Sequence, residues 1–166
     1  MIAALPLMLT VNGEEGEYRV GTLTTLAEFL RGDLGLTGTH LACEEGVCGS
    51  CTVLMDGKTV RSCLTLALQA DGRKIVTTEG YANDTRLKRV QDGFAEGFAA
   101  QCGFCTSGMM AVVAEYLDDQ AIETPESEAT IRQRLCSAAC RCTGYQFITE
   151  TVVRLARNRK EAASRG

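Results

Sequence analysis

"CEEGVCGSCTVLMDGKTVRSC", residues 43–63, places four cysteines around the pattern of a short hairpin. The first three cysteines have the spacing C-x4-C-x2-C, and the fourth follows after eleven further residues. Between them, the Asp-Gly pair at 56–57 is a two-residue turn signal flanked by TVLM and KTV, which predicts a β-hairpin. Counting outward from this turn returns Cys63 to the side of Cys51, next to the other cysteines.

This spacing is that of a plant-type [2Fe–2S] site. Such a loop must turn its backbone N–H groups toward negatively charged sulfur atoms, and Gly46 and Gly49 allow the chain to curl in this way. The predicted ligands of this first site are Cys43, Cys48, Cys51 and Cys63. The alternatives are four core cysteines or a zinc site, but zinc sites favour two close cysteine pairs at opposite ends of a small domain.

Composition and charge argue against several other classes of protein. The 166 residues, 45% hydrophobic and 23% charged, suit a globular chain of one ordinary domain or two small ones. A net charge of −4 and the lack of tryptophan argue against nucleic-acid binding. No apolar run reaches the ~18 residues of a membrane-spanning helix, and the N-terminus has a strand pattern rather than that of a signal peptide. We therefore expect a cytoplasmic protein, in which nine cysteines indicate metal or redox chemistry rather than disulfides.

The first half of the chain carries strand and turn signals with one helix. LMLTV and GEYRV flank the Asn-Gly pair at 12–13, which predicts a second hairpin. Thr24 or Thr25 can cap a short helix that carries Leu26 and Phe29 on its apolar side. KIVTTEG adds one more strand. These signals predict a small mixed sheet wrapped around one helix.

The second half carries helical periodicity, with apolar residues three or four positions apart in four segments. These residues are Leu87, Val90, Phe94 and Phe98, then Met109, Val112, Val113, Tyr116 and Leu117, then Ile131 and Leu135, and finally Tyr145, Ile148, Val152 and Leu155. The Thr-Pro-Glu triplet at 124–126 predicts the start of the third helix. Arg157, Arg159 and Lys160 are favourable near the C-terminus of the fourth. Four helices predict a small bundle.

Five further cysteines lie in this helical half. QCGFCTSG supplies Cys102 and Cys105 before a helix that a side chain within 106–107 could cap, and CRCTGY supplies Cys140 and Cys142 before the last helix. A helix N-terminus offers unpaired N–H groups to an anionic cluster. Two helix-junction loops with two thiolates each predict a second site, for which zinc is a competitor. A thioredoxin-like redox pair is disfavoured, because no β-α-β pattern surrounds the first loop.

A plant-type cluster loop, then QCGFCT, then CRCTGY, over almost the whole chain, resembles the small iron–sulfur subunit of the xanthine oxidase (molybdenum hydroxylase) family. The resemblance implies an α+β fold: a ferredoxin-like β-grasp domain in residues 1–80 and a four-helix bundle domain in residues 81–166, each with one [2Fe–2S] cluster. It implies the ligands Cys43, Cys48, Cys51 and Cys63 for an outer cluster and Cys102, Cys105, Cys140 and Cys142 for an inner one.

The resemblance also implies an electron-transfer subunit that performs no substrate catalysis of its own. Electrons would pass from a molybdopterin cofactor through the inner and outer clusters to FAD. These cofactors would lie in a large molybdopterin-binding and a medium FAD-binding subunit, assembled as a dimer of heterotrimers. Gln101 matches the family's glutamine that contacts the pterin, or else it is an ordinary polar residue at a helix end. A free-standing ferredoxin-like carrier and a zinc-stabilised interaction module are the alternative functions.

A few positions depart from the family pattern or stand outside it. Ser107 replaces a common proline and can still cap a helix. Cys136 replaces a serine, and Ser137-Ala138 replace Gly-Asn, which removes a side-chain amide near the inner site. Cys136 is therefore predicted to be the spare ninth cysteine. His40, the only histidine, is predicted to be a plain polar residue, because a Rieske centre requires two histidines.

Overall fold

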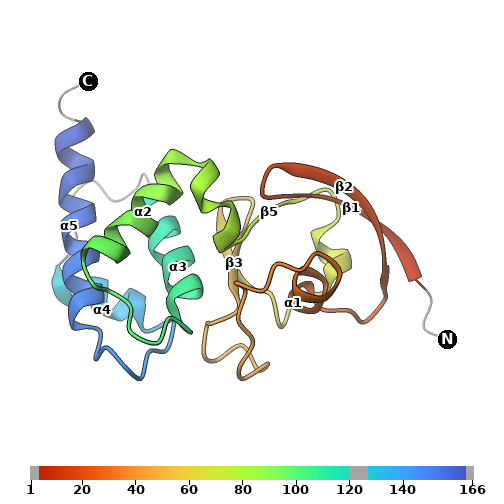
Figure 1. Ribbon diagram of the computed structural model, residues 1–166, viewed down its shortest axis with the longest axis horizontal. Coiled ribbons are helices and arrows are strands. Elements are labelled where there is room, and N and C mark those ends of the chain that lie inside the picture. Colours follow the sequence, from red (N-terminus) through yellow and green to blue (C-terminus); the bar gives the residue numbers. More distant parts are fainter. Residues whose placement is uncertain (1–3, 120–126, 164–166) are drawn as a thin grey trace.

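A five-stranded mixed sheet forms the N-terminal half of the computed structural model, which describes residues 4–119 and 127–163 (Figure 1). The strands are β1 (Ala4–Val11), β2 (Glu14–Gly21), β3 (Thr52–Met55), β4 (Lys58–Arg61) and β5 (Lys74–Val76). Their order is β2-β1-β5-β3-β4, and β5 pairs in parallel with β1 and antiparallel with β3. The predicted small mixed sheet is confirmed, with one hairpin on each side of a central strand.

Both hairpins turn at the predicted residues. The φ angles are +53° and +91° at 12–13, and +51° and +80° at 56–57. Positive φ at both central residues is the type I′ geometry, whose twist matches that of the flanking strands. In the second hairpin, Ser62 Oγ donates a hydrogen bond to Cys51 O at 2.6 Å, so the pairing predicted by counting from the turn continues toward the fourth cysteine.

The predicted helix of the first half is short and packs against the sheet. Helix α1 (Leu26–Glu28) begins at Thr25, whose side chain accepts from the Glu28 N–H while the Glu28 carboxylate accepts from the Thr25 N–H. A wider π turn, Phe29–Asp33, continues it. The buried residues that join this helix to the sheet are Leu7, Leu9, Val11, Val20, Leu26, Phe29, Leu30, Val53 and Ile75. Two 3-10 turns, Ala67–Ala70 and Thr78–Asn83, complete this half.

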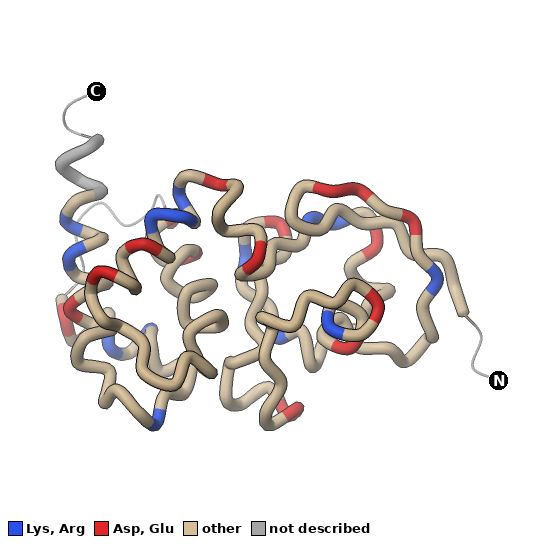
Figure 2. The backbone as a smooth tube through the Cα atoms, in the orientation of Figure 1, with Lys and Arg blue, Asp and Glu red and all other residues tan. Residues whose placement is uncertain are grey.

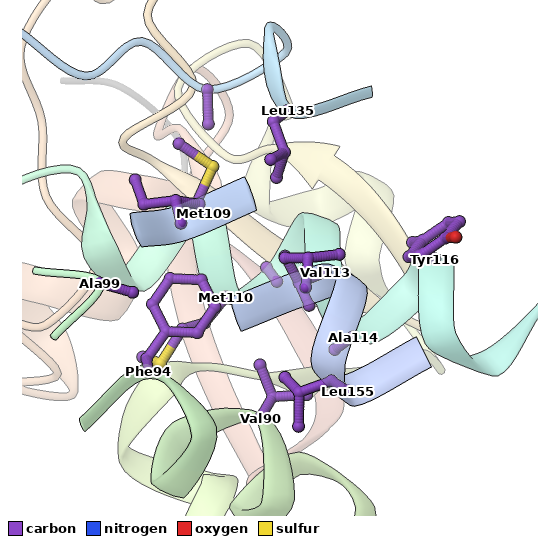
Figure 3. Close-up of a cluster of buried hydrophobic side chains, with 14 of the residues drawn as sticks. Val90, Phe94, Ala99, Met109, Met110, Val113, Ala114, Tyr116, Leu135 and Leu155 are labelled. Carbon is purple, nitrogen blue, oxygen red and sulfur yellow. The ribbon is translucent and has the colours of Figure 1, made fainter. Parts of the chain in front are cut away.

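The described part of the second half contains four helices arranged around α3. They are α2 (Thr85–Glu96), α3 (Thr106–Asp118), α4 (Glu128–Leu135) and α5 (Gln146–Ala163). Helix α3 packs against each of the other three and also against β3 and β4. Figure 3 shows the resulting core, in which side chains of α3, such as Met110 and Val113, lie in one cluster with Phe94 of α2 and Leu155 of α5. Of the described helices, none is both long and apolar enough to cross a membrane.

Two details of the helices differ from the periodicity. Phe98 does not extend the apolar face of α2, because the helix ends at Glu96 with Gly97 as its C-cap. Phe98 has a φ of +51° and is 78% exposed. The N-cap of α3 is Cys105, without a side-chain cap from residues 106–107. The sequence period therefore identified the helices correctly but extended the apolar face of α2 too far.

Two further expectations fall on residues that are not described. The predicted helix start at 124–126 and the side chains at 159–160 lie outside the described residues. Within the described part, Ser127 is the N-cap of α4 and its hydroxyl accepts from the Thr130 N–H at 3.2 Å.

Candidate metal centres

The first cysteine loop curls around Cys43. Positive φ angles occur at Glu44 (+54°), Gly46 (+77°) and Gly49 (+75°). The backbone N–H groups of Glu45 and Cys48 both donate to Cys43 Sγ at 3.4 Å. These N–H groups, that of Cys48 most strongly, lower the pKa of the Cys43 thiol to about 6. The loop therefore already has the inward N–H groups that a bound, negatively charged sulfur needs.

The four cysteines of this loop and hairpin form two adjacent pairs. The side chain of Cys43 lies beside that of Cys48. The hairpin returns Cys63 to Cys51, and these two side chains also lie beside each other. Burial, and then the neighbouring Cys51 thiol, raises the pKa of Cys63 to about 11. The structure therefore brings together all four residues predicted for the first site.

The second group also forms two pairs, each joining a residue of one loop to a residue of the other. Cys102 Sγ and Cys142 Sγ lie 3.6 Å apart, both on exposed residues. Cys105 lies beside Cys140, and burial, followed by the Cys140 hydrogen bond, raises the pKa of Cys105 to about 12. At Cys140 burial raises the pKa, but hydrogen bonds from Thr143 and other groups outweigh it and the net shift is downward. One pair therefore lies at the surface and the other lies deeper.

The paired arrangement fits [2Fe–2S] clusters. Each iron of such a cluster takes two protein thiolates, so four cysteines in two pairs form a complete donor set. In residues 4–119 and 127–163, no three His, Cys, Asp or Glu side chains converge on a point suited to a single metal ion. The residues present at each site therefore fit a two-iron group.

The two sites lie close to one another. The Ala139 N–H donates to Cys48 O at 2.8 Å, which joins the loop before Cys140 to the first loop. A Cβ on Gly49 would meet Ser137 O at 2.4 Å, and a Cβ on Gly108 would meet Gly49 O at 2.1 Å. Figure 1 shows the three cysteine-bearing loops along the lower side of the molecule. Glycine at both positions therefore lets the first cysteine loop lie against the Ser137 backbone and the first turn of α3.

Gln101 and Cys136 take different places relative to these pairs. Gln101 is exposed and directly precedes Cys102, so its amide is accessible at the surface beside the second site. Cys136 is the exposed C-cap of α4, and its N–H donates to Arg132 O at 3.2 Å. Neither thiol pair of the second site includes Cys136.

His40 and Arg61 connect the sites, a role that the sequence analysis assigned to neither side chain. The His40 ring stacks on Phe104 at a centroid distance of 4.8 Å, and its Nδ1 lies 2.8 Å from Phe104 O. Ser107 Oγ lies 3.5 Å from the same nitrogen, so this serine faces the histidine instead of capping α3. Arg61 reaches both loops through its guanidinium group. The sequence offers only two signals for these contacts. A lone histidine lies near Cys43, and the predicted hairpin pairing ends at Arg61.

Comparisons with known proteins find an iron–sulfur domain family in each half of the chain. Residues 9–78 match the 2Fe-2S iron-sulfur cluster binding domain family, and residues 77–153 match the [2Fe-2S] binding domain family. The chain is 45% identical to caffeine dehydrogenase subunit gamma of Pseudomonas sp. (strain CBB1), covering 88% of this chain and 87% of that protein. It is 49% identical to the nicotine 6-hydroxylase small subunit of Paenarthrobacter nicotinovorans, covering 86% and 84%.

Two further relatives extend this similarity. The chain is 42% identical to the xanthine dehydrogenase iron-sulfur-binding subunit of Escherichia coli O157:H7, covering 87% of this chain and 89% of that protein. Among solved structures, a chain of quinoline 2-oxidoreductase from Pseudomonas putida 86 superposes with a TM-score of 0.85 at 43% identity, covering 98% of both chains.

Proposed function

Because the chain belongs to the iron–sulfur subunits of the xanthine oxidase family of molybdenum hydroxylases, we propose that it transfers electrons between two partner subunits through two [2Fe–2S] clusters. Its N-terminal part is a ferredoxin-like [2Fe–2S] domain, and the protein is a subunit of an oxidoreductase. The observation that carries the proposal is the grouping of eight cysteines into four thiol pairs at two adjacent sites.

Each site uses its own part of the chain to hold a cluster. The proposed ligands are Cys43, Cys48, Cys51 and Cys63 for the outer cluster, and Cys102, Cys105, Cys140 and Cys142 for the inner cluster. When bound, the clusters supply reversible one-electron transfer. The inward N–H groups of the first loop stabilise negative charge on sulfur. The two sites are also directly connected, because Ala139, which directly precedes Cys140, donates a 2.8 Å hydrogen bond to Cys48 O.

We further propose the direction of transfer and the partners. Electrons enter from a molybdopterin cofactor in a large subunit, which Gln101 contacts, and leave to FAD in a medium subunit, within a dimer of heterotrimers. The exposed pair Cys102 and Cys142 supports an inner site that faces a partner. The relatives are themselves named as subunits, which supports assembly with other chains.

The division into two domains near residue 80, the second of them a four-helix bundle, remains part of this proposal. It is supported by the two family matches, which meet at residues 77–78, and by two separate hydrophobic clusters, one mainly in each half. A cytoplasmic location is likewise a proposal, supported by nine cysteines that are all free thiols.

Metal analysis and spectroscopy test the proposed function directly. Protein purified without oxygen should contain about four iron and four sulfide per chain, since each cluster holds two of each. Reduction should give two distinct paramagnetic signals. A colourless protein with stoichiometric zinc, or a protein with only one signal, would contradict the proposal. Purification of a tagged chain together with a flavin subunit and a molybdopterin subunit would test the proposed assembly.

A further inference from the structure

The guanidinium group of Arg61 lies between the two candidate centres. Arg61 is the last residue of β4 and stands two positions before Cys63. Its Nε donates to Gly46 O at 3.2 Å, its Nη1 donates to Thr52 Oγ1, and its Nη2 donates to Ser137 O. One planar side chain therefore binds the first cysteine loop, β3 and the segment that leads to Cys140.

The contact with Gly46 affects the first site through a single peptide unit. The trans peptide is planar, so a carbonyl held on one side directs the following N–H to the other side. The Gly46 carbonyl faces Arg61, so the N–H of the same peptide unit, that of Val47, points away from the guanidinium group. Arg61 thus fixes the orientation of a peptide unit that lies between Cys43 and Cys48 in the first cysteine loop.

The contact with Thr52 extends the same control to the second glycine of the loop. Thr52 Oγ1 accepts from Arg61 and donates to Gly49 O at 2.6 Å. Gly49 in turn lies against Ser137 O, which Arg61 also binds. The guanidinium group therefore closes a network that includes both loop glycines and the backbone of the second site.

The charge of Arg61 is not paired with a carboxylate among the described residues. The ion pairs of the described chain involve other cations, and the acceptors of Arg61 are two carbonyls and one hydroxyl. A positive charge at this place stabilises the more negative, reduced state of a nearby cluster. Arginine suits the role better than lysine, because its rigid fork can serve three acceptors at once.

We propose that Arg61 is a positioning residue for both centres, which orients the Gly46–Val47 peptide at the first site and holds the Ser137 segment of the second site against it. The inference rests on the proposed two-cluster function. It predicts that the reduction potentials and the magnetic interaction between the two reduced clusters both depend on this one side chain.

The test compares Arg61→Gln and Arg61→Lys in the full-length protein with both clusters bound. Potentials are measured by redox titration followed by electron paramagnetic resonance, and the interaction by the splitting of the signals in the fully reduced protein. Arg61→Gln should lower both midpoint potentials and change the splitting. Arg61→Lys keeps the charge, so its potentials should stay closer to wild type, while its splitting should change as in Arg61→Gln.

Arg73→Gln is the matched control, because it removes one arginine from an exposed ion pair with Asp56. It should leave potentials and splitting unchanged. Wild-type values of both quantities in Arg61→Gln, or equal shifts in Arg73→Gln, would overturn the inference. Should Arg61→Gln fail to fold, an unchanged splitting in Arg61→Lys would overturn it as well. Fewer than two cluster signals in the wild type would overturn the proposed function itself, and the inference with it.

Discussion

The exposed thiols Cys136 and Cys142 illustrate how position decides the role of a residue. Cys142 lies 3.6 Å from Cys102, whereas Cys136 ends α4 through its backbone hydrogen bonds. Cys142→Ser should therefore lose about half of the iron and only the inner-cluster signal, because one iron loses a ligand. Cys136→Ser is the control and should retain both signals and all iron. Iron analysis and electron paramagnetic resonance measure both outcomes, and loss of a signal in Cys136→Ser would contradict the assignment of the spare cysteine.

Gly108 allows the closest backbone contact between the two sites. A Cβ at this position would meet Gly49 O at 2.1 Å, and a backbone atom cannot move aside as a flexible side chain can. Gly108→Ala should therefore lower the free energy of unfolding by ~1–3 kcal/mol, the usual cost of overpacking. Gly32→Ala is the matched control, because a Cβ there has no heavy atom within 4 Å. Thermal unfolding compares the two, and equal stability of both variants would contradict the predicted contact.

At the scale of elements, Glu115 joins α3 to β4. Its carboxylate accepts from the Thr59 N–H at 2.9 Å and lies 3.5 Å from Lys58 Nζ. Burial raises the pKa of Glu115, but the Thr59 hydrogen bond and Lys58 outweigh it, so the net pKa lies below the usual value. A lowered pKa in the folded state means that the contact stabilises the protein above the ordinary carboxyl pKa. This contribution is lost as the pH falls through the folded-state value.

Glu115→Gln should therefore destabilise the protein at pH 7 by up to about 1 kcal/mol, a modest amount because Lys58 is exposed. The difference from wild type should shrink toward pH 4. Chemical denaturation at the two pH values measures it. Glu128→Gln is the control, because it removes a carboxylate whose ion pair with Arg132 lies within α4 and does not join α3 to β4. If the stability difference between Glu115→Gln and wild type did not depend on pH, the ionised Glu115 carboxylate would not stabilise the contact between α3 and β4.

Local chemistry explains which elements the sequence predicts well. Asn-Gly at 12–13 and Asp-Gly at 56–57 fix two hairpins, and the cysteine spacing identifies the loop at 43–51, because each signal acts over a few residues. The stacking of His40 on Phe104 joins residues 64 positions apart, and no local pattern encodes it. Phe98 shows the opposite error of a local pattern: its spacing fits the helix, but the helix has already ended at Glu96. Residues that connect the two halves, Arg61 among them, therefore emerge only from the folded chain.

At the scale of the whole molecule, the charged residues are unevenly distributed. Figure 2 shows few acidic and basic residues on the cysteine loops and many on α2, α5 and the outer hairpin. Several large apolar residues near the cysteines remain exposed, namely Val47, Leu64, Phe104 and Phe147. Apolar side chains grouped around functional loops are typical of surfaces that a partner covers. In the proposed assembly, the surface around Val47 belongs to the interface of the outer cluster.

Val47 gives the sharpest test of that interface, because its side chain is 74% exposed and lies in the outer cysteine loop. A lysine there would place a charge in an apolar contact. Val47→Lys should thus weaken binding of the flavin subunit about tenfold or more, the effect of disrupting a central contact. Both cluster signals should persist, since the backbone of the loop is unchanged. Met8→Lys, at a 50% exposed residue of β1, is the control for an apolar-to-lysine change elsewhere. Equal binding of both variants in a titration of the purified subunits would place the interface away from this loop.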